Sequence, residues 1–196
     1  MAKTKGALFG LGASGQLAKT IVFGSWKGIG TAREYVKPSN PNTALQQAQR
    51  ALLTAAVTAF HAAAYSVADM TAWARLASIQ SKVMSGFNVF TKIHVAQGIL
   101  GNVWEPMSAV VISAIANDGW QTNVTKVSGG NAPHIWIGTR ATFLSDIAAL
   151  TDNTGNDWEY TWAAAGADTD YYFQLRSGAS GTDYGCTGIY KVRTIV

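Results

Sequence analysis

Few side chains in this sequence are spaced for catalysis. His61, His94 and His134 stand far apart, and none lies in an H-x-x-x-H or H-x-E pattern that would bring metal ligands or an acid–base pair together. Cys186 follows Asp-Tyr-Gly without a nucleophile signature. Because it is the single cysteine, an internal disulfide framework and a cysteine zinc cluster are excluded. We therefore predict no catalytic residue and no enzyme activity.

Three aspartates near the end of the chain are candidates for cation binding. Asp168, Asp170 and Asp183 flank predicted loops, and Ca²⁺ is bound by carboxylate and carbonyl oxygens in such places. Acidic residues in turns between strands are more often simply solvated, and we interpret these three in that way. We predict no bound metal.

A G-x-G-x-x-G motif at Gly10, Gly12 and Gly15 has the spacing of a dinucleotide phosphate loop. That loop requires a strand before it, a helix after it and a second strand in a unit of about 30 residues. Only nine residues precede Gly10, and the next strand-like run already begins at Thr20. Glycines that permit tight turns and close backbone packing explain the motif better, and we predict no cofactor.

Composition favours an assembly over a free monomer. Of the 196 residues, 48% are hydrophobic and 13% are charged, whereas an ordinary soluble domain has about 25% charged residues. A large surface with so few charged residues is poorly solvated by water. Permanent contact with other subunits would cover part of that surface. Residues 51–68 carry no fixed charge, but this stretch is rich in alanine and contains Thr54, Thr58 and His61, so we predict a helix buried in protein and no membrane span.

The positive charge is concentrated at the start of the chain. Residues 1–50 carry a net charge of +6, and the remainder carries −2. A basic arm can meet nucleic acid, an acidic protein surface or anionic lipid. No signal peptide is visible, and the single cysteine fits synthesis in a reducing cytoplasm.

The stretch from Trp26 to Arg50 has the residues of a docking segment. Pro38 and Pro41 force the residues before them into extended backbone. Thr43 and Gln46 then form a capping-box pattern at the start of a helix. An extended arm that leads directly into a helix is suited to contact with another protein surface, where aromatic residues act as anchors. Aromatic residues near basic groups could instead stack on nucleic-acid bases. The predicted interface residues are Trp26, Lys27, Arg33, Tyr35, Lys37, Pro38, Asn40, Pro41, Gln46 and Arg50.

Three segments must position these residues. Residues 1–42 are predicted to be an extended, glycine-rich basic arm with a strand at 20–23. Residues 43–101 form a helical module: a first helix from Thr43 with an apolar stripe from Leu45 to Ala63, a second starting near Ser66 or Asp69, and a third over 87–95. The glycines and proline of 98–106 mark the boundary to the next domain.

Beyond that boundary the hydrophobic pattern has a period of two. Turn signals separate the predicted strands, which cover 110–115, 121–127, 134–138, 158–162, 171–176 and 188–195. Residues 142–150 fit either a strand or a short helix. We predict an α+β fold: the arm and helical module, followed by an all-β sandwich over 105–196.

Two resemblances extend this interpretation. Residues 105–196 resemble a fibronectin type III or immunoglobulin-like sandwich, through Pro106, Trp136, the strand from Tyr171 to Arg176 and the final run from Tyr190. Residues 3–90 resemble uncharacterised proteins of phages and bacterial mobile elements; the matching motifs are Lys5-Gly6, Gly12-Ala-Ser-Gly15, Trp26-Lys27-Gly28, Arg33, Pro38-Ser-Asn40-Pro41-Asn-Thr43, Gln46 or Gln47, Arg50, Trp73 and Ser85-Gly-Phe-Asn88-Val-Phe90. This second resemblance implies a structural protein of the virion, made in the bacterial cytoplasm.

The sequence thus supports two hypotheses of function. In the first, the protein is a non-enzymatic virion component, anchored by its N-terminal half to copies of itself or to capsid, connector or tail subunits, with the sandwich displayed. In the second, it is a binding module whose sandwich recognises glycans or a host surface, or whose basic arm binds DNA.

Overall fold

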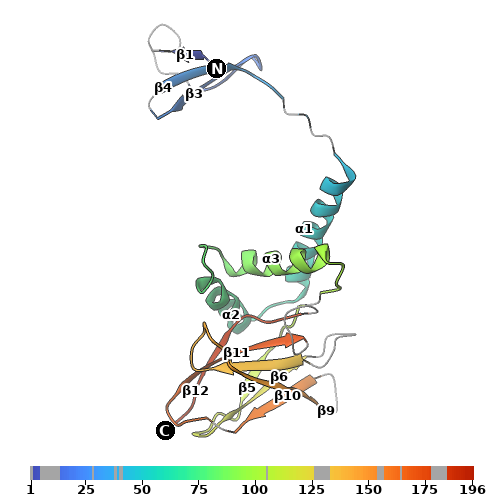
Figure 1. Cartoon of the computed structure of the whole chain (residues 1–196), viewed down its shortest axis with the longest axis vertical. Coiled ribbons are helices and arrows are strands. Elements are labelled where there is room, and N and C mark those ends of the chain that lie inside the picture. Colours follow the sequence, from blue (N-terminus) through green and yellow to red (C-terminus); the bar gives the residue numbers. More distant parts are fainter. Residues whose placement is uncertain are drawn as a thin grey trace. The chain divides into compact units, whose positions relative to one another are not determined.

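The computed structural model describes residues 2–4, 14–27, 29–37, 39, 42–104, 106–125, 133–153, 157–163, 165–177 and 185–196. The chain divides into two compact units, Met1–Thr43 and Ala44–Val196 (Figure 1). The fold is α+β, as the sequence predicts. It consists of a small N-terminal sheet, where the sequence predicts an extended arm with one strand, followed by three helices and two packed four-stranded antiparallel sheets.

In the first unit, the extended residues pair with one another as a sheet. Its strands are β1 (Ala2–Thr4), β2 (Gly15–Leu17), β3 (Ile21–Trp26) and β4 (Ile29–Glu34), all antiparallel, in the order β1-β4-β3-β2. Ala18 and Lys19 form the turn before β3 with φ angles of 43° and 55°, and Lys27 has a φ of 49° in the turn between β3 and β4. The sequence predicted one strand here, because pairing between distant short segments leaves little local signal.

The second unit begins with three helices, α1 (Ala44–Ala62), α2 (Val67–Ser78) and α3 (Gly86–Ile99). The start of α2 is confirmed at Ser66, whose side chain accepts a hydrogen bond from the Asp69 backbone N–H while the Asp69 carboxylate accepts one from the Ser66 backbone N–H. The Ser85 side chain caps α3 by accepting from the Asn88 backbone N–H, and this helix is longer than predicted, since it continues past Val95. The helix predicted from Thr43 is confirmed as α1.

Aromatic side chains hold the helices together. Phe90 of α3 lies edge-to-face against Trp73 of α2, with ring centroids 5.4 Å apart, and against Trp104 at 5.1 Å. Phe60 of α1 reaches the same cluster at 5.1 Å from Phe90. A Cβ on Gly86 would lie 2.9 Å from the Trp73 backbone, so the close crossing of α2 and α3 depends on a residue without a side chain.

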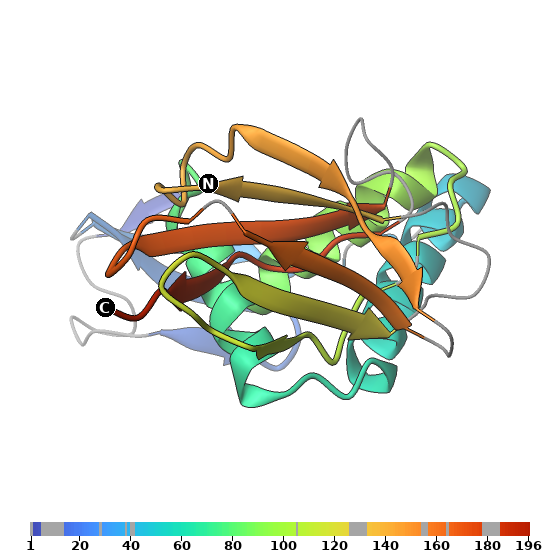
Figure 2. The same cartoon turned by 90° about the horizontal axis from the view of Figure 1, so that it is seen from below.

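Eight strands form the two larger sheets (Figure 2). One sheet has the order β5-β6-β10-β9 and the other β12-β11-β7-β8. Their bounds are β5 Val111–Ser113, β6 Trp120–Thr125, β7 Pro133–Gly138, β8 Asp146–Ala149, β9 Thr151–Asn153, β10 Asp157–Trp162, β11 Asp170–Ser177 and β12 Tyr190–Arg193. Residues 142–150 therefore contain a strand, and β9 lies where the sequence predicted a turn.

The core between the two sheets is formed by alternating residues of each strand. Trp120 and Val124 of β6 face Ile135 and Ile137 of β7 and Phe173 of β11 in one buried cluster. In β11 the predicted alternation is correct for Phe173 and Leu175, which are fully buried. Gln174, on the opposite face of β11, is buried as well, because the segment before β12 covers it and the Thr187 carbonyl accepts a hydrogen bond of 2.7 Å from its side chain.

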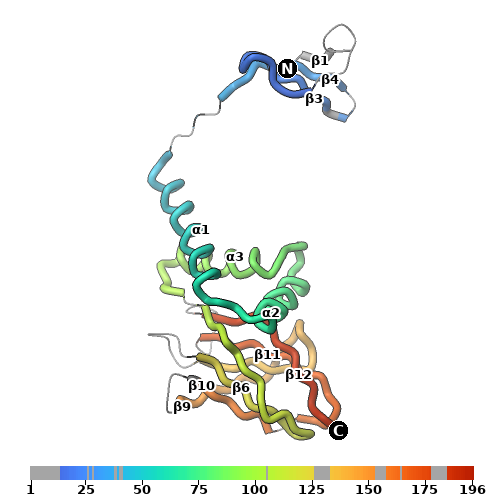
Figure 3. The backbone as a smooth tube through the Cα atoms, turned by 180° about the vertical axis from the view of Figure 1, so that it is seen from behind, coloured from blue at the N-terminus to red at the C-terminus, as the bar shows by residue number. Residues whose placement is uncertain are grey.

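Helix α2 packs directly on the sandwich beside β12 (Figure 3). The Ile189 backbone N–H donates to the Ala72 carbonyl at 3.0 Å, and Arg75 donates to the Ile189 carbonyl at 2.7 Å. The buried Asp69 carboxylate accepts a hydrogen bond from the Tyr190 hydroxyl. The helices and the sandwich are therefore joined by hydrogen bonds as well as by apolar packing.

Candidate interaction surface

Strand register in the N-terminal sheet defines two faces. Val22 on β3 pairs with Gln16 on β2 and with Arg33 on β4, so these three side chains share one face, which we name the Arg33 face. Ile21 pairs with Leu17 and with Glu34 on the other face. The predicted interface residue Arg33 thus belongs to a surface built from three strands.

No side chain that the structure describes between residues 14 and 37 is buried. Leu17 is 51% exposed, Ile21 40% and Ile29 45%. A sheet gains stability by covering at least one apolar face, and a small sheet that covers neither is marginal in water. The N-terminal sheet therefore has apolar surface to offer on both faces.

A groove of about 750 Å³ lies on this sheet. It is lined by Gly15, Gln16, Val22, Arg33, Glu34, Tyr35 and Val36. The Tyr35 backbone N–H donates to the Thr20 carbonyl at 2.7 Å, which fixes the chain after β4 beside the turn before β3. A guanidinium, a carboxylate, a phenol and aliphatic groups thus line one open depression, a combination suited to an aromatic or polar group of a partner.

The structure brings only part of the predicted interface together. Arg33 and Tyr35 line the same groove, and Lys37 is exposed two residues beyond Tyr35. Lys27 is exposed in the β3–β4 turn, at the opposite end of β4 from Arg33. Trp26 is the last residue of β3 and pairs with Ile29, but its side chain lies outside the described part of the structure. Pro38, Asn40 and Pro41 also lie outside the described residues.

Gln46 and Arg50 lie on the exposed first two turns of α1, in the second unit. All residues from Ala44 to Ala51 are exposed, and Leu45 is 81% exposed. The later half of α1 is packed: Ala56 is fully buried, and Leu52 occupies the space where a Cβ on Gly98 of α3 would lie. The predicted apolar stripe of α1 is therefore covered over its later half and uncovered at its start.

Sequence reasoning missed Gln16 and Val22 as members of this surface. Gln16 follows the glycine motif, which hid the short strand β2 that carries it. Residues 16–21 do not alternate between apolar and polar types, so the sequence carries no strand signal at β2. Register, which places Gln16 and Arg33 on either side of Val22, cannot be read from one sequence.

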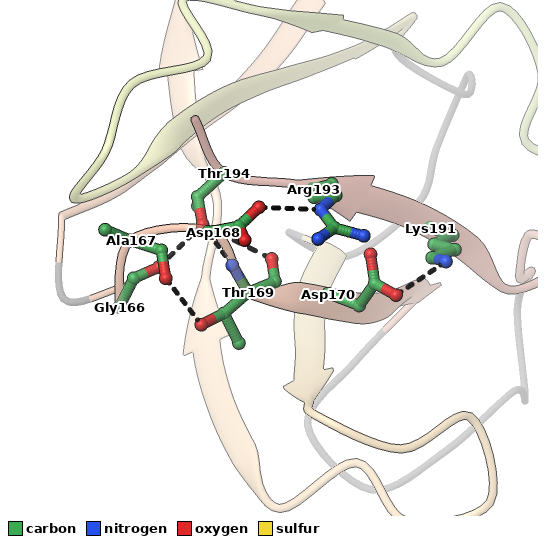
Figure 4. A network of polar contacts seen from close by, with 8 residues as sticks. All are labelled: Gly166, Ala167, Asp168, Thr169, Asp170, Lys191, Arg193 and Thr194. Carbon is green, nitrogen blue, oxygen red and sulfur yellow. Dashed lines mark hydrogen bonds and ion pairs between the residues drawn. The ribbon is translucent and has the colours of Figure 1, made fainter. Parts of the chain in front are cut away.

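Two of the three candidate cation ligands are engaged in ion pairs (Figure 4). The Asp168 carboxylate is 2.9 Å from Nε of Arg193, and Asp170 is 2.7 Å from Nζ of Lys191. The hydrogen bond and the charge of Arg193 lower the pKa of Asp168 below 3.8. Asp183 lies outside the described residues. Among the residues that are described, no three His, Cys, Asp or Glu side chains are grouped to hold a metal ion.

The histidines and the cysteine lie on separate elements. His61 is exposed near the end of α1, His94 packs on Trp104 at 5.4 Å between ring centroids, and His134 lies on β7. Burial lowers the pKa of His94. Cys186 is fully buried, and this burial raises the pKa of its thiol to about 12. A thiol of that kind is a poor nucleophile at neutral pH.

No protein-family model matches the chain, and no curated protein is similar to it in sequence. Within the described residues, no helix is long and apolar enough to cross a membrane.

Proposed function

We propose that this protein is a non-enzymatic structural component of a bacteriophage particle, which assembles with copies of itself through residues 1–62 and displays its sandwich. The observation that carries the proposal is the N-terminal sheet, in which no described side chain is buried. A four-stranded sheet of this size becomes stable when a partner covers its apolar residues. The permanent neighbours of a subunit in a particle are such partners.

The exposed start of α1 supports the same conclusion. A 19-residue helix with Arg50 as its one fixed charge exposes Leu45 and Leu53 along its first half. Surface helices of soluble proteins normally present charged residues on the exposed side. An exposed helix with so little charge is better explained as a contact between subunits than as a solvated surface.

The sandwich fits a display role through its immunoglobulin-like character. In chain order, β5, β6 and β7 correspond to strands A, B and C, β8 to the added strand C′, and β9 to β12 to strands D to G. With these letters the two sheets have the orders A-B-E-D and G-F-C-C′, as in immunoglobulin-like domains. Tyr171, at the start of strand F, accepts a hydrogen bond of 2.8 Å from the Gly166 backbone N–H, and a tyrosine tied to the preceding corner is typical of these domains. Such sandwiches present loops on a rigid frame and host many binding roles.

The assignment to a phage particle rests on the resemblance of residues 3–90 to proteins of phages and mobile elements. The partners proposed are other copies of the chain and, within the particle, capsid, connector or tail subunits. Synthesis in the bacterial cytoplasm and incorporation into the virion follow from the same assignment.

The test is the mass of the full-length protein in solution. Size-exclusion chromatography with light scattering, at about 10 to 100 μM, should give a mass several times the 20.8 kDa of one chain. Ile21→Arg places a charge on the exposed apolar face of the sheet and should lower that mass, whereas Thr54→Arg, on an exposed side of α1 away from Leu45, should not. A wild-type protein that stays monomeric over this range contradicts the proposal.

DNA binding is a second candidate, favoured by the groove that holds Arg33 beside Tyr35. Basic groups that contact phosphates release counterions, so DNA retention would fall steeply with salt. Arg33→Gln and Tyr35→Ala should both weaken such binding, since the tyrosine would stack a base. Retention that does not change with salt or with these variants excludes this candidate.

A further inference from the structure

Arg176 on β11 is a half-buried cation without an acidic partner. Its guanidinium lies over the ring of Trp136 on β7, 4.2 Å from the ring centroid. Burial lowers the pKa of Arg176. Among the residues that the structure describes, no aspartate or glutamate forms an ion pair with it. Cys186, which pairs with Arg176 in an isolated β-bridge, has a thiol pKa of about 12 and is neutral at physiological pH. A cation that is partly removed from water is stabilised by an anion, so Arg176 is suited to bind one.

A chain of hydrogen bonds holds this guanidinium in place. Nε of Arg176 donates to the side-chain oxygen of Gln174 at 2.8 Å. The amide nitrogen of the buried Gln174 donates in turn to the Thr187 backbone carbonyl at 2.7 Å. A guanidinium that is fixed at Nε and stacked on an aromatic ring keeps its two Nη groups as a planar fork. Such a fork matches the two oxygens of a carboxylate.

Two more nitrogen atoms on the same side of the sheet lack a hydrogen-bond partner. In the register of β7 with β11, His134 pairs with Arg176 and Trp136 pairs with Gln174, so these four side chains share the outer face, opposite the core between the sheets. Nδ1 of His134 and Nε1 of Trp136 are buried and have no partner within the described residues. Unpaired buried nitrogens are rare in folded proteins and call for an explanation such as a bound water, ion or ligand. The indole N–H and the Nη groups are all donors, which favours a ligand that carries acceptor oxygens.

The exposed surface beside these side chains is small and aliphatic. On β8, Ile147 pairs with Trp136 and Ala149 pairs with His134. Ile147 is 48% exposed, and Ala149 is exposed as well. On the other side the surface ends at Gln174, which is buried under the segment before β12. A stable protein–protein contact buries about 800 Å² on each partner, far more than a few side chains offer. A single sugar residue fits this space better, because its C–H groups can lie on aliphatic side chains.

We propose that the outer face of β7 and β11 binds an acidic sugar, whose carboxylate is held by the Nη groups of Arg176 and whose ring lies against Ile147. This inference goes beyond the assembly function, because it gives the displayed sandwich a ligand. Trp136 supplies the platform on which the guanidinium lies, and Gln174 fixes its orientation. Specificity for the acid comes from a charge that no described residue of the chain neutralises.

The test is saturation-transfer NMR on the full-length protein, in which the signals of a small ligand are observed. Methyl glucuronide is the probe. Methyl glucoside, which has a CH₂OH group in place of the carboxylate, is its matched control. The glucuronide should bind with a Kd of about 1 mM and the glucoside at least about tenfold more weakly. Because the ligand is observed whatever the mass of the protein, failure of this test is distinguishable from failure of the assembly function.

Variants locate the site. Arg176→Gln removes the charge and Arg176→Lys removes the fork, so each should weaken binding of the glucuronide at least about tenfold. Ile147→Glu leaves the contacts of Arg176 in place but puts a carboxylate beside it at an exposed position, and it should weaken binding by a similar factor. Arg193→Gln is the matched control: it lies on β12 of the same sheet, its guanidinium is paired with Asp168, and its binding should equal that of the wild type. Far-UV circular dichroism and melting temperature show whether each variant is folded.

Four other outcomes overturn the proposal. Equal binding of the glucuronide and the glucoside would show that the carboxylate is not recognised. Acetate that binds as tightly as the glucuronide would show that the sugar ring contributes nothing. Tighter binding of N-acetyl-aspartate amide would point to an acidic protein partner instead of a sugar. Wild-type affinity in both Arg176→Gln and Ile147→Glu, or no saturation transfer to the glucuronide at about 10 mM, would show that this face binds no acidic sugar.

Discussion

Gly188 lies where the segment before β12 packs closely on the backbone of α2. An added Cβ there would lie 2.3 Å from the Ala72 carbonyl carbon and from the Trp73 backbone nitrogen. Neither atom is the end of a flexible side chain, so the backbone itself must move. Gly188 therefore allows the close packing of α2 against the segment before β12.

Gly188→Ala is expected to destabilise the second unit by about 1–3 kcal/mol, the usual cost of overpacking a rigid interior. The hydrogen bond from the Ile189 backbone N–H to the Ala72 carbonyl should lengthen as well. Chemical denaturation gives the change in free energy of unfolding. Gly166→Ala is the matched control, since the nearest atom to its Cβ is the Thr169 side-chain oxygen at 3.3 Å. Equal stabilities for the two variants would show that the close contact at Gly188 is not rigid.

The ion pair of Asp168 and Arg193 makes the stability of the folded state depend on pH. Because Arg193 lowers the pKa of Asp168 below 3.8, the pair stabilises the folded state at pH values above the ordinary carboxyl value. That contribution is lost as the pH falls through the lowered pKa. NMR titration should show the pKa of Asp168 returning toward 3.8 in Arg193→Gln, whereas Arg140→Gln, a cation in another turn, should leave it unchanged. An unshifted pKa in the wild type would contradict the pairing.

The sequence predicted those helices and strands whose signals lie within a few neighbouring residues. Ser66 and Asp69 start α2 because a capping box is formed within four residues, and the strands from β10 to β12 follow from alternation between clear turns. It did not predict β9, because Asp152 and Asn153 read as a turn, nor the pairing of β1 with β4, which joins residues far apart in the chain. Of the candidate surface, Arg33 and Tyr35 were found by their types, whereas Gln16 and Val22 join them only through register.

From the exposed start of α1 we predict that the α1 helices of two copies pack against each other. If α1 of two copies pack antiparallel around Ala48, Leu45 of one copy meets Ala51 of the other, so a large side chain faces a small one. Ala48→Cys should then form a disulfide between copies under mild oxidation, because the two Cβ atoms meet at the crossing point. Cys186 is buried and should not compete.

Two further variants define the geometry of that contact. Leu45→Cys and Ala51→Cys should crosslink when mixed and much less when each is alone, and Thr54→Cys, on another exposed side of the helix, should not crosslink. Efficient crosslinking of Leu45→Cys with itself would indicate parallel helices instead. Absence of all crosslinks at about 100 μM would exclude this contact between α1 helices.

On the scale of the whole molecule, the two units differ in how many of their described side chains are buried. Residues 44–196 contain two clusters of buried apolar side chains, one between the sheets and one among the helices. Residues 14–37 contain no buried side chain where the structure describes them. A chain with 13% charged residues that folds residues 44–196 around a core, and in which no described side chain of residues 14–37 is buried, is suited to a permanent assembly in which neighbours cover those residues.

Hydrogen exchange measured against protein concentration tests this claim most directly. Backbone amides of β3 and β4 should gain protection as the concentration of the full-length protein rises and copies cover the sheet, while amides of α2 and β11 stay equally protected throughout. Strong protection of β3 and β4 that is the same at every concentration, in a protein whose mass is that of one chain, would contradict the account.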